Sequence, residues 1–166
     1  MRHVILATAA FCAAVLVCGP AFTQQPAPPA PPPAPQFVLG TPITLEQAKK
    51  VGAAAEAEAM RRNMNMVIAV VEPNGALTYF QRMTGSQYAS IKIAQEKAIS
   101  AALFGRFTKT FRERVEKGDL TPMALAGAIW SDGGVPIIVD GKVIGAIGSS
   151  GGADDAVSQA GADALQ

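Results

Sequence analysis

The chain has 166 residues, of which 49% are hydrophobic, and it carries 14 basic and 13 acidic side chains. A charge so close to balance gives no electrostatic reason to expect binding to nucleic acid or to an anionic membrane. Its two cysteines and its one histidine, Cys12, Cys18 and His3, all precede residue 19. Beyond that point the sequence excludes disulfides, Cys/His zinc sites, cysteine nucleophiles and Ser-His-Asp triads.

The first residues have the pattern of a secretory signal peptide. Arg2 supplies a short positive region, residues 4–17 are apolar, and Ala21 or Thr23 suits the cleavage position. The apolar stretch is shorter than the about 20 residues that a spanning helix needs, so we expect no stable membrane insertion after cleavage. Lipid attachment at Cys18 is the alternative. The sequence thus predicts a signal peptide over residues 1–23 and a periplasmic or secreted protein.

A proline-rich segment follows over residues 24–40. Its central run, PAPPAPPPAP, favours polyproline II, a semi-rigid spacer without a packed core. We interpret the segment as a tether, with a partner-binding motif as the alternative. Residues 41–166 then have the length of one domain.

The domain begins with a predicted helix and a predicted hairpin. Thr44 and Gln47 have the spacing of a capping box, and apolar residues keep helical spacing after them. Residues 66–72 read as an apolar strand, Pro73-Asn74-Gly75 as a turn, and residues 76–82 as the returning strand.

Two further helices are predicted next. Residues 88–104 carry alanine and isoleucine at helical spacing, which suits close packing on a sheet. Residues 108–117 form a more charged helix. The segment after it, residues 118–134, is harder to assign, with residues 124–130 forming either a short helix or a strand.

A second hairpin is predicted near the end of the chain. Residues 135–139 form a β-branched strand, Asp140-Gly141 favours a two-residue turn with positive φ at both positions, and residues 142–147 return. A small-residue helix closes the chain over residues 152–165. The order of helices and tight hairpins predicts an α+β fold, a single domain with an antiparallel sheet built from two hairpins and flanked by helices.

A glycine-rich stretch separates the last strand from the last helix. Gly148, Gly151 and Gly152 surround Ser149 and Ser150, so main-chain N–H groups are expected to be free for an anion or a polar ligand. Close packing of the backbone is the other interpretation.

Four segments in this order resemble the GlcG-like family, which includes extracellular haem-binding proteins and is often labelled haem-degrading. They are IAVVEPNGAL at residues 68–77, QRMTGS at 81–86, AQEKAISAALF at 94–104 and GGVPIIVDGKVIGAIGSSGG at 133–152. The resemblance covers nearly the whole domain and implies a homo-oligomer, from dimer to octamer. The chain departs from the family at Glu72 and Thr84, where an aspartate is usual.

The resemblance implies that haem is a candidate cofactor, although no metal site of the Cys/His type exists here. Thr108 lies where haem-binding relatives place a threonine near the iron, and an N-cap is its other interpretation. Further candidate iron ligands are Lys97, Met64, Met66, Met83, Met123, Tyr79 and Tyr88. Otherwise, the methionines are interpreted as core filling.

Three functions remain open from the sequence. The first is a small-molecule-binding protein whose ligand is haem or a related tetrapyrrole, with no nucleic-acid partner. Its predicted ligand-binding residues are Arg82, Lys97, Thr108, Gly134, Gly148, Ser149 and Gly151. The second is a cofactor-free isomerase or lyase acting on a small organic acid, with Glu72 or Asp132 as the base. The third is a structural oligomer without a ligand.

Overall fold

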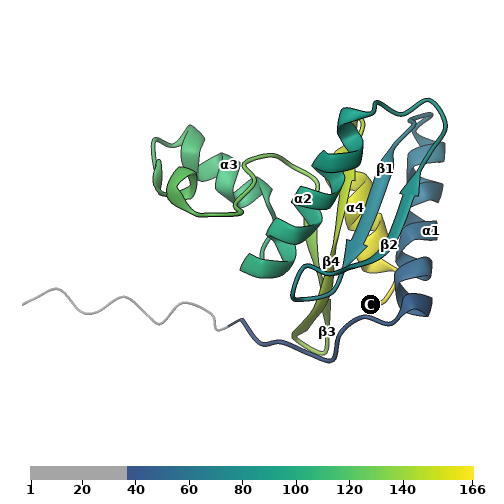
Figure 1. Cartoon of the computed structure of the whole chain (residues 1–166), viewed down its shortest axis with the longest axis horizontal. Helices are drawn as coiled ribbons and strands as arrows, with labels where there is room; N and C mark the ends of the chain where they lie inside the picture. The colour runs from purple at the N-terminus through teal and green to yellow at the C-terminus, as the bar shows by residue number, and fades with distance from the viewer. Residues whose placement is uncertain (1–36) are drawn as a thin grey trace, which may run out of the picture. The chain divides into compact units, whose positions relative to one another are not determined.

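The computed structural model describes residues 37–166, so the predicted signal peptide and most of the predicted linker lie outside the described residues. In the described part, helices pack on one four-stranded sheet (Figure 1). The elements are α1 (Leu45–Arg61), β1 (Val67–Val71), β2 (Leu77–Arg82), α2 (Ala89–Phe104), α3 (Lys109–Glu116), the 3₁₀ helix η1 (Thr121–Ala124), β3 (Gly134–Val139), β4 (Lys142–Ser150) and α4 (Asp154–Asp163).

The start of α1 is set by the capping box that the sequence predicts. The backbone N–H of Gln47 donates to Thr44 Oγ1 at 3.3 Å, and the backbone N–H of Thr44 donates to Gln47 Oε1 at 2.9 Å. Both bonds satisfy donors that the first helical turn leaves unpaired. The apolar stripe behind them is buried at Ala48, Val51 and Ala55, which confirms the predicted helical period.

The four strands run in the order β2-β1-β4-β3, and every neighbouring pair is antiparallel. The two predicted hairpins are therefore joined through β1 and β4. The second hairpin turns at Asp140 and Gly141, whose φ values of 50° and 72° confirm the predicted two-residue turn. The α+β fold class and the antiparallel sheet are confirmed.

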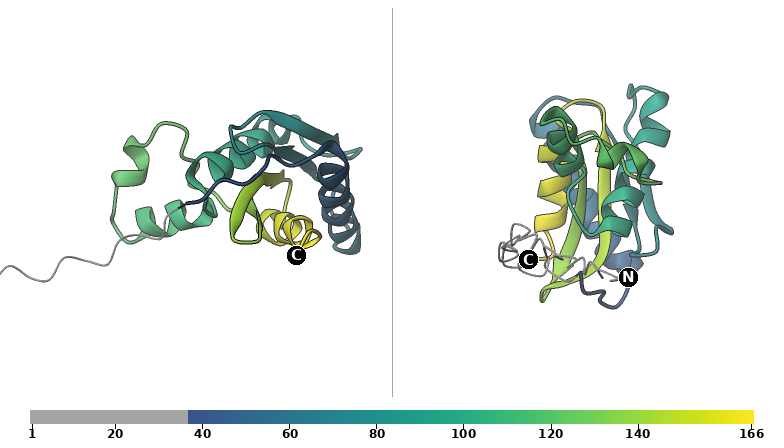
Figure 2. Two further views of the ribbon diagram at one scale, coloured as in Figure 1. Left: turned by 90° about the horizontal axis from the view of Figure 1, so that it is seen from below. Right: turned by 90° about the vertical axis from the view of Figure 1, so that its left-hand side faces the viewer.

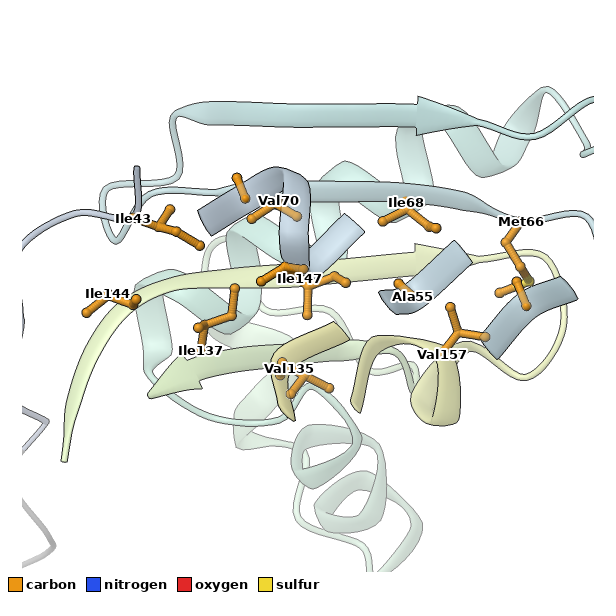
Figure 3. Packing of buried hydrophobic residues seen from close by; sticks show 14 residues of the cluster. Ile43, Ala55, Met66, Ile68, Val70, Val135, Ile137, Ile144, Ile147 and Val157 are labelled. Atoms are coloured by element: carbon orange, nitrogen blue, oxygen red, sulfur yellow. The ribbon is translucent and has the colours of Figure 1, made fainter. Parts of the chain in front are cut away.

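Helices cover both faces of the sheet (Figure 2). On one face, alanines of α2 pack against Val67, Ala69 and Val71 of β1. On the other face, α1 and α4 enclose a larger cluster that includes Ile68 and Val70 of the same strand (Figure 3). Because β1 is buried on both sides, its sequence is continuously apolar rather than alternating.

Two boundaries differ from the sequence predictions. The prediction of a helix or strand at residues 124–130 is wrong, because η1 ends at Ala124 and a turn follows, with Gly127 at a φ of 81°. The predicted end of the last strand at residue 147 is also wrong. β4 continues to Ser150, because β1 pairs with it as far as Val67 opposite Ser150.

The folded part includes residues that the sequence analysis placed in the linker. Leu39 forms a parallel bridge with Val143, and the backbone N–H of Gly40 donates to the Val143 carbonyl at 2.9 Å. Residues 39–40 thus pair with β4 along the edge that faces β1, beyond the point where β1 ends. Among residues 37–166, no helix is both long and apolar enough to cross a membrane.

Candidate functional site

A groove of about 690 Å³ opens at the end of the sheet where β4 leaves and α4 begins. Its volume lies in the range of small-molecule and cofactor sites, about 300–1,000 Å³. The first turn of α3, the residues just before β3 and the first turn of α4 supply its walls. The lining residues are Lys109, Arg112, Ser131, Asp132, Gly152, Ala153, Asp154, Asp155, Ala156 and Gln159.

Two ion pairs stand in this groove. Lys109 Nζ lies 2.9 Å from Asp155 Oδ2, and Arg112 Nε lies 2.7 Å from Asp132 Oδ1. The hydrogen bond that Lys109 donates to Asp155 raises the pKa of Lys109, and the hydrogen bonds that Arg112 donates to Asp132 and Glu116 raise the pKa of Arg112. Both cations therefore stay charged through neutral pH, each beside a carboxylate of the chain itself.

One carboxylate oxygen of the groove has no hydrogen-bond partner within residues 37–166. It is Asp155 Oδ1, a buried atom on a side chain that is one-third exposed. Its other oxygen accepts from Lys109. A buried acceptor without a donor is energetically unfavourable.

Behind the groove wall, Lys97 is buried with 1% of its surface exposed. Its Nζ lies 2.5 Å from Asp154 Oδ2 and donates to the Ser149 carbonyl at 3.3 Å. Lys97 is one of the ligand-binding residues predicted from the sequence. Here α2 directs its ammonium toward α4, behind the groove wall rather than into the groove.

The glycine-rich exit from β4 does not have free N–H groups at its centre. Asp154 Oδ1 accepts from the backbone N–H of Gly151 at 2.9 Å and of Gly152 at 2.8 Å. The expectation that these donors are free for an anion is therefore wrong. The Asp154 carboxylate at the start of α4 turns back toward the preceding loop and takes the position at which an external anion would bind.

Gly148 and Ser149 belong to strand β4 rather than to a loop. A Cβ at Gly148 would lie 2.1 Å from the Ala94 carbonyl oxygen and 2.4 Å from the Ala98 nitrogen, so glycine lets α2 approach the sheet. Ser149 is fully buried, and its hydroxyl donates to the Asp154 carbonyl at 2.6 Å. Both residues serve packing, the second interpretation of the glycine-rich stretch.

Thr108 lies just outside the groove and is fully buried. Its hydroxyl donates to the Ser131 carbonyl at 2.5 Å and accepts from the Gly134 N–H at 2.9 Å. Its side chain makes no capping bond to α3, although the residue precedes that helix. The hydroxyl thus holds the segment before β3 against α3. A Cβ at Gly134 would lie only 2.5 Å from the methyl carbon of Thr108, so glycine at this position leaves space for the threonine.

The remaining predicted site residues lie apart from one another. Arg82 ends the edge strand β2, and its guanidinium donates to the Ser86 carbonyl at 3.2 Å and stacks over Tyr88 at 4.8 Å from the ring centre. It does not line the groove. Glu72 follows β1 at the opposite end of the sheet from Asp132, so these two candidate bases do not share a site.

Lys109, Arg112 and Asp155 line the groove but are not among the site residues predicted from the sequence. A signal was present, because positions three apart lie on the same face of a helix, and Lys109 and Arg112 have this spacing. Nothing local connects that face with the first turn of α4, since 46 residues separate the Lys109–Asp155 pair.

The fold and the order of these segments are shared with known proteins. Residues 43–165 match the model of the family described as haem degrading protein HbpS-like. The chain belongs to this family. It is 40% identical to Protein GlcG of Escherichia coli over 109 residues, which is 65% of this chain and 81% of GlcG. The predicted membership of the GlcG-like family is confirmed.

Solved structures show the same fold. Klebsiella pneumoniae protein ORFY superposes with a TM-score of 0.71 and 31% identity, over 82% of this chain and 97% of that one. A double mutant of Streptomyces reticuli HbpS superposes with a TM-score of 0.69 and 26% identity, over 84% of this chain and 98% of that one. The PduOC chain in a complex with haem superposes with a TM-score of 0.68 and 23% identity, over 76% of this chain and 96% of that one. At this identity the likeness shows a shared fold alone.

Proposed function

We propose that this chain binds haem or a related tetrapyrrole in the groove between α3, the start of β3 and α4. Membership of a family described as haem degrading supports this ligand class, and a protein of the same fold has been solved with haem. The observation that carries the proposal to this site is the groove of about 690 Å³ with the paired cations Lys109 and Arg112 in its wall.

The two cations suit the carboxylates of a tetrapyrrole. The planar guanidinium of Arg112 can hold a carboxylate through two parallel bonds, whereas the ammonium of Lys109 acts as a point charge. In the free protein these cations face Asp132 and Asp155, which hold them in place. A bound propionate competes with these carboxylates, so affinity depends on both cations and falls with rising ionic strength.

Iron ligation is less well provided for than carboxylate binding. None of the described residues that line the groove is His, Cys, Met or Tyr, the usual haem ligands. The Thr108 hydroxyl is engaged on both sides, with Ser131 and Gly134. When bound, haem supplies its own redox-active iron. The part that this chain would play is to hold the carboxylates, which is the role of a binding protein.

The enzyme alternative has less support from the geometry. Asp132 is partly exposed in an open groove and is held by Arg112, whereas a proton-transfer site needs a carboxylate in a small closed cavity. Glu72 lies at the far end of the sheet. The alternative of a structural oligomer leaves the groove unexplained.

A haemin titration followed by the Soret band tests the proposal. We expect a saturable shift at one haem per chain, weakened in Lys109→Ala and in Arg112→Ala. Lys92→Ala is the matched control, because it removes the same charge from an exposed position on α2. A shift that never saturates, or one that weakens equally in all three variants, contradicts binding in this groove.

The proposal includes export of the protein. It rests on the sequence of residues 1–23, with its positive start, apolar centre and small residues near Ala21 and Thr23. N-terminal sequencing of protein recovered from a periplasmic or secreted fraction tests it. A new N-terminus after Ala21 or Thr23 agrees with export, whereas a chain that keeps its first residues in the cell interior contradicts it.

A further inference from the structure

The two cations of the groove differ in how fully the chain's own carboxylates engage them. Arg112 donates from Nε to Asp132 Oδ1 at 2.7 Å and from Nη2 to Asp132 Oδ2 at 3.5 Å. Asp132 thus lies against the side of the guanidinium that offers two parallel N–H groups. Arg112 Nη1 donates to Glu116 Oε1 at 2.6 Å. Three of the five N–H donors of Arg112 therefore face carboxylates of the chain itself.

Lys109 is less fully engaged than Arg112. An ammonium group has three N–H donors, and within residues 37–166 one oxygen accepts from Lys109 Nζ, which is Asp155 Oδ2 at 2.9 Å. Lys109 can therefore bind a ligand carboxylate without breaking its ion pair. A ligand carboxylate that takes the two-donor side of Arg112 must instead displace Asp132.

The backbone on both sides of Asp132 is fixed, so its release from the guanidinium is a movement of the side chain. The Ser131 carbonyl accepts from the buried Thr108 hydroxyl. The Gly133 carbonyl accepts from the Ser158 hydroxyl at 2.7 Å. The Asp132 side chain itself is 43% exposed. Rotation about its own bonds carries the carboxylate into solvent, where water replaces the guanidinium, and a pair as exposed as this one is weak.

Lys109 and Arg112 are close enough to serve one ligand. Both line the groove, and they lie three positions apart on α3, which places their Cβ atoms about 5–6 Å from each other on one face. A ligand whose first carboxylate is held by Lys109 presents its second carboxylate to Arg112 at a high effective concentration. A free monocarboxylate lacks this advantage over Asp132, which is itself attached to the chain.

We propose that Asp132 is a latch that determines the specificity of the groove. It holds the two-donor side of Arg112 against single anions and releases it to the second carboxylate of a ligand that Lys109 already binds. The ligand class that opens the latch is a dicarboxylate with both groups on one side of the molecule. The choice of a tetrapyrrole with two propionates rests on the proposed function, whereas the latch itself does not.

The first test follows the Arg112 side chain by NMR, with acetate as a single-carboxylate probe and no tetrapyrrole. We expect acetate to leave the Arg112 Nε–H signal of the unmodified chain in place and to shift it saturably in Asp132→Ala. The Nε–H of Arg114 is the internal control, because it donates to Asp119 at 2.8 Å outside the groove and should not respond in either protein. An Arg112 shift that is equal in the two proteins, or absent from both, overturns the latch.

The second test compares gallium protoporphyrin, a haem analogue, with its monomethyl ester, which keeps one carboxylate. We expect Asp132→Ala to bind the diacid about two- to fivefold more tightly than the unmodified chain does, because no partly exposed ion pair has to be broken. The affinity for the monoester, held by Lys109 alone, should change less. Asp119→Ala is the matched control, because it removes the same charge from an Arg–Asp pair of similar exposure outside the groove, and it should change neither affinity.

Weaker binding of the diacid by Asp132→Ala overturns the latch, because Asp132 would then serve to position Arg112 for the ligand. Circular dichroism checks that each variant is folded. If gallium protoporphyrin binds to none of these proteins, the proposed haem function fails, and the acetate test still decides the latch.

Discussion

Lys97 joins three parts of the molecule through a single carboxylate. Its ammonium, on α2, pairs with the Asp154 carboxylate at the start of α4. The other oxygen of Asp154 accepts hydrogen bonds from the N–H groups of Gly151 and Gly152 after β4. A buried ion pair of this kind is weak evidence for net stability, but breaking it leaves an uncompensated charge. The groove wall at Asp154 therefore depends on a residue that does not line the groove.

Replacing Lys97 by methionine tests this connection. We expect Lys97→Met to lower the free energy of unfolding by about 3 kcal/mol, because Asp154 loses the buried ammonium that pairs with it. The combined variant Lys97→Met with Asp154→Asn is expected to cost less than the sum of the two single changes, since they share a partner. Urea denaturation measures all three, and strictly additive losses would show that the pair is not coupled.

Glu58 gives a prediction about pH. It accepts hydrogen bonds from Arg61 and Arg62 in the last turn of α1, and these lower its pKa from 4.5 to about 2. A lowered pKa in the folded state means that the ion pairs contribute stability above pH 4.5, and that this contribution is lost as the pH falls through about 2. A carboxyl NMR titration should give a midpoint near 2. With Arg61→Gln and Arg62→Gln together, the midpoint should move toward 4.5, and an unchanged midpoint would refute the assignment.

At the scale of elements, α2 and β4 pack closely because glycine and alanine face each other. Gly148 has no room for a Cβ beside the backbone of α2, and Ala94 and Ala98 present only methyl groups to the sheet. Backbone atoms cannot rotate away as a flexible side chain can. The spacing between this helix and this strand is thus set by one glycine.

Gly148→Ala is expected to lower the free energy of unfolding by about 1–3 kcal/mol or more, because α2 must move away from the sheet. Gly141→Ala is the matched control. The φ of Gly141 is 72°, and among the described residues no heavy atom lies within 4 Å of where its Cβ would be. The loss of stability in Gly141→Ala therefore measures backbone strain without a steric clash. Thermal unfolding compares them, and an equal loss in both variants would contradict close packing at Gly148.

Local signals predicted the elements well, and long-range contacts account for what they missed. The capping box at Thr44 and the turn at Asp140-Gly141 each depend on a few neighbouring residues, and both are present as predicted. The end of β4 depends instead on pairing with β1, some 80 residues away in the chain. The same holds for Lys97, whose partner Asp154 lies 57 residues further along the chain.

For the whole molecule, the region from the end of α2 to the start of β3 exposes several large apolar side chains. In Figure 1, α3 and the segment after it project away from the sheet. Large apolar side chains that are 36–61% exposed lie in this region. They are Leu103, Leu120, Met123, Leu125 and Trp130. Exposed apolar surface of this kind is typical of contacts between subunits.

The predicted homo-oligomer can therefore be tested at this surface. We expect light scattering to give a mass of two or more chains, and Leu120→Glu with Met123→Glu to shift it toward one chain by placing charge in the contact. Met60→Glu is the matched control, because this equally exposed methionine lies on α1. A single-chain mass for the unmodified protein would contradict oligomer formation.

Binding of a tetrapyrrole in the groove between α3, the start of β3 and α4 can be observed directly. The most direct test is ¹H–¹⁵N NMR of the chain with gallium protoporphyrin, a diamagnetic analogue of haem. We expect the amide signals of residues 109–112, 131–132 and 152–156 to shift and to saturate together. Shifts concentrated elsewhere, around Arg82 and Tyr88 for example, with the groove signals unchanged, would contradict it.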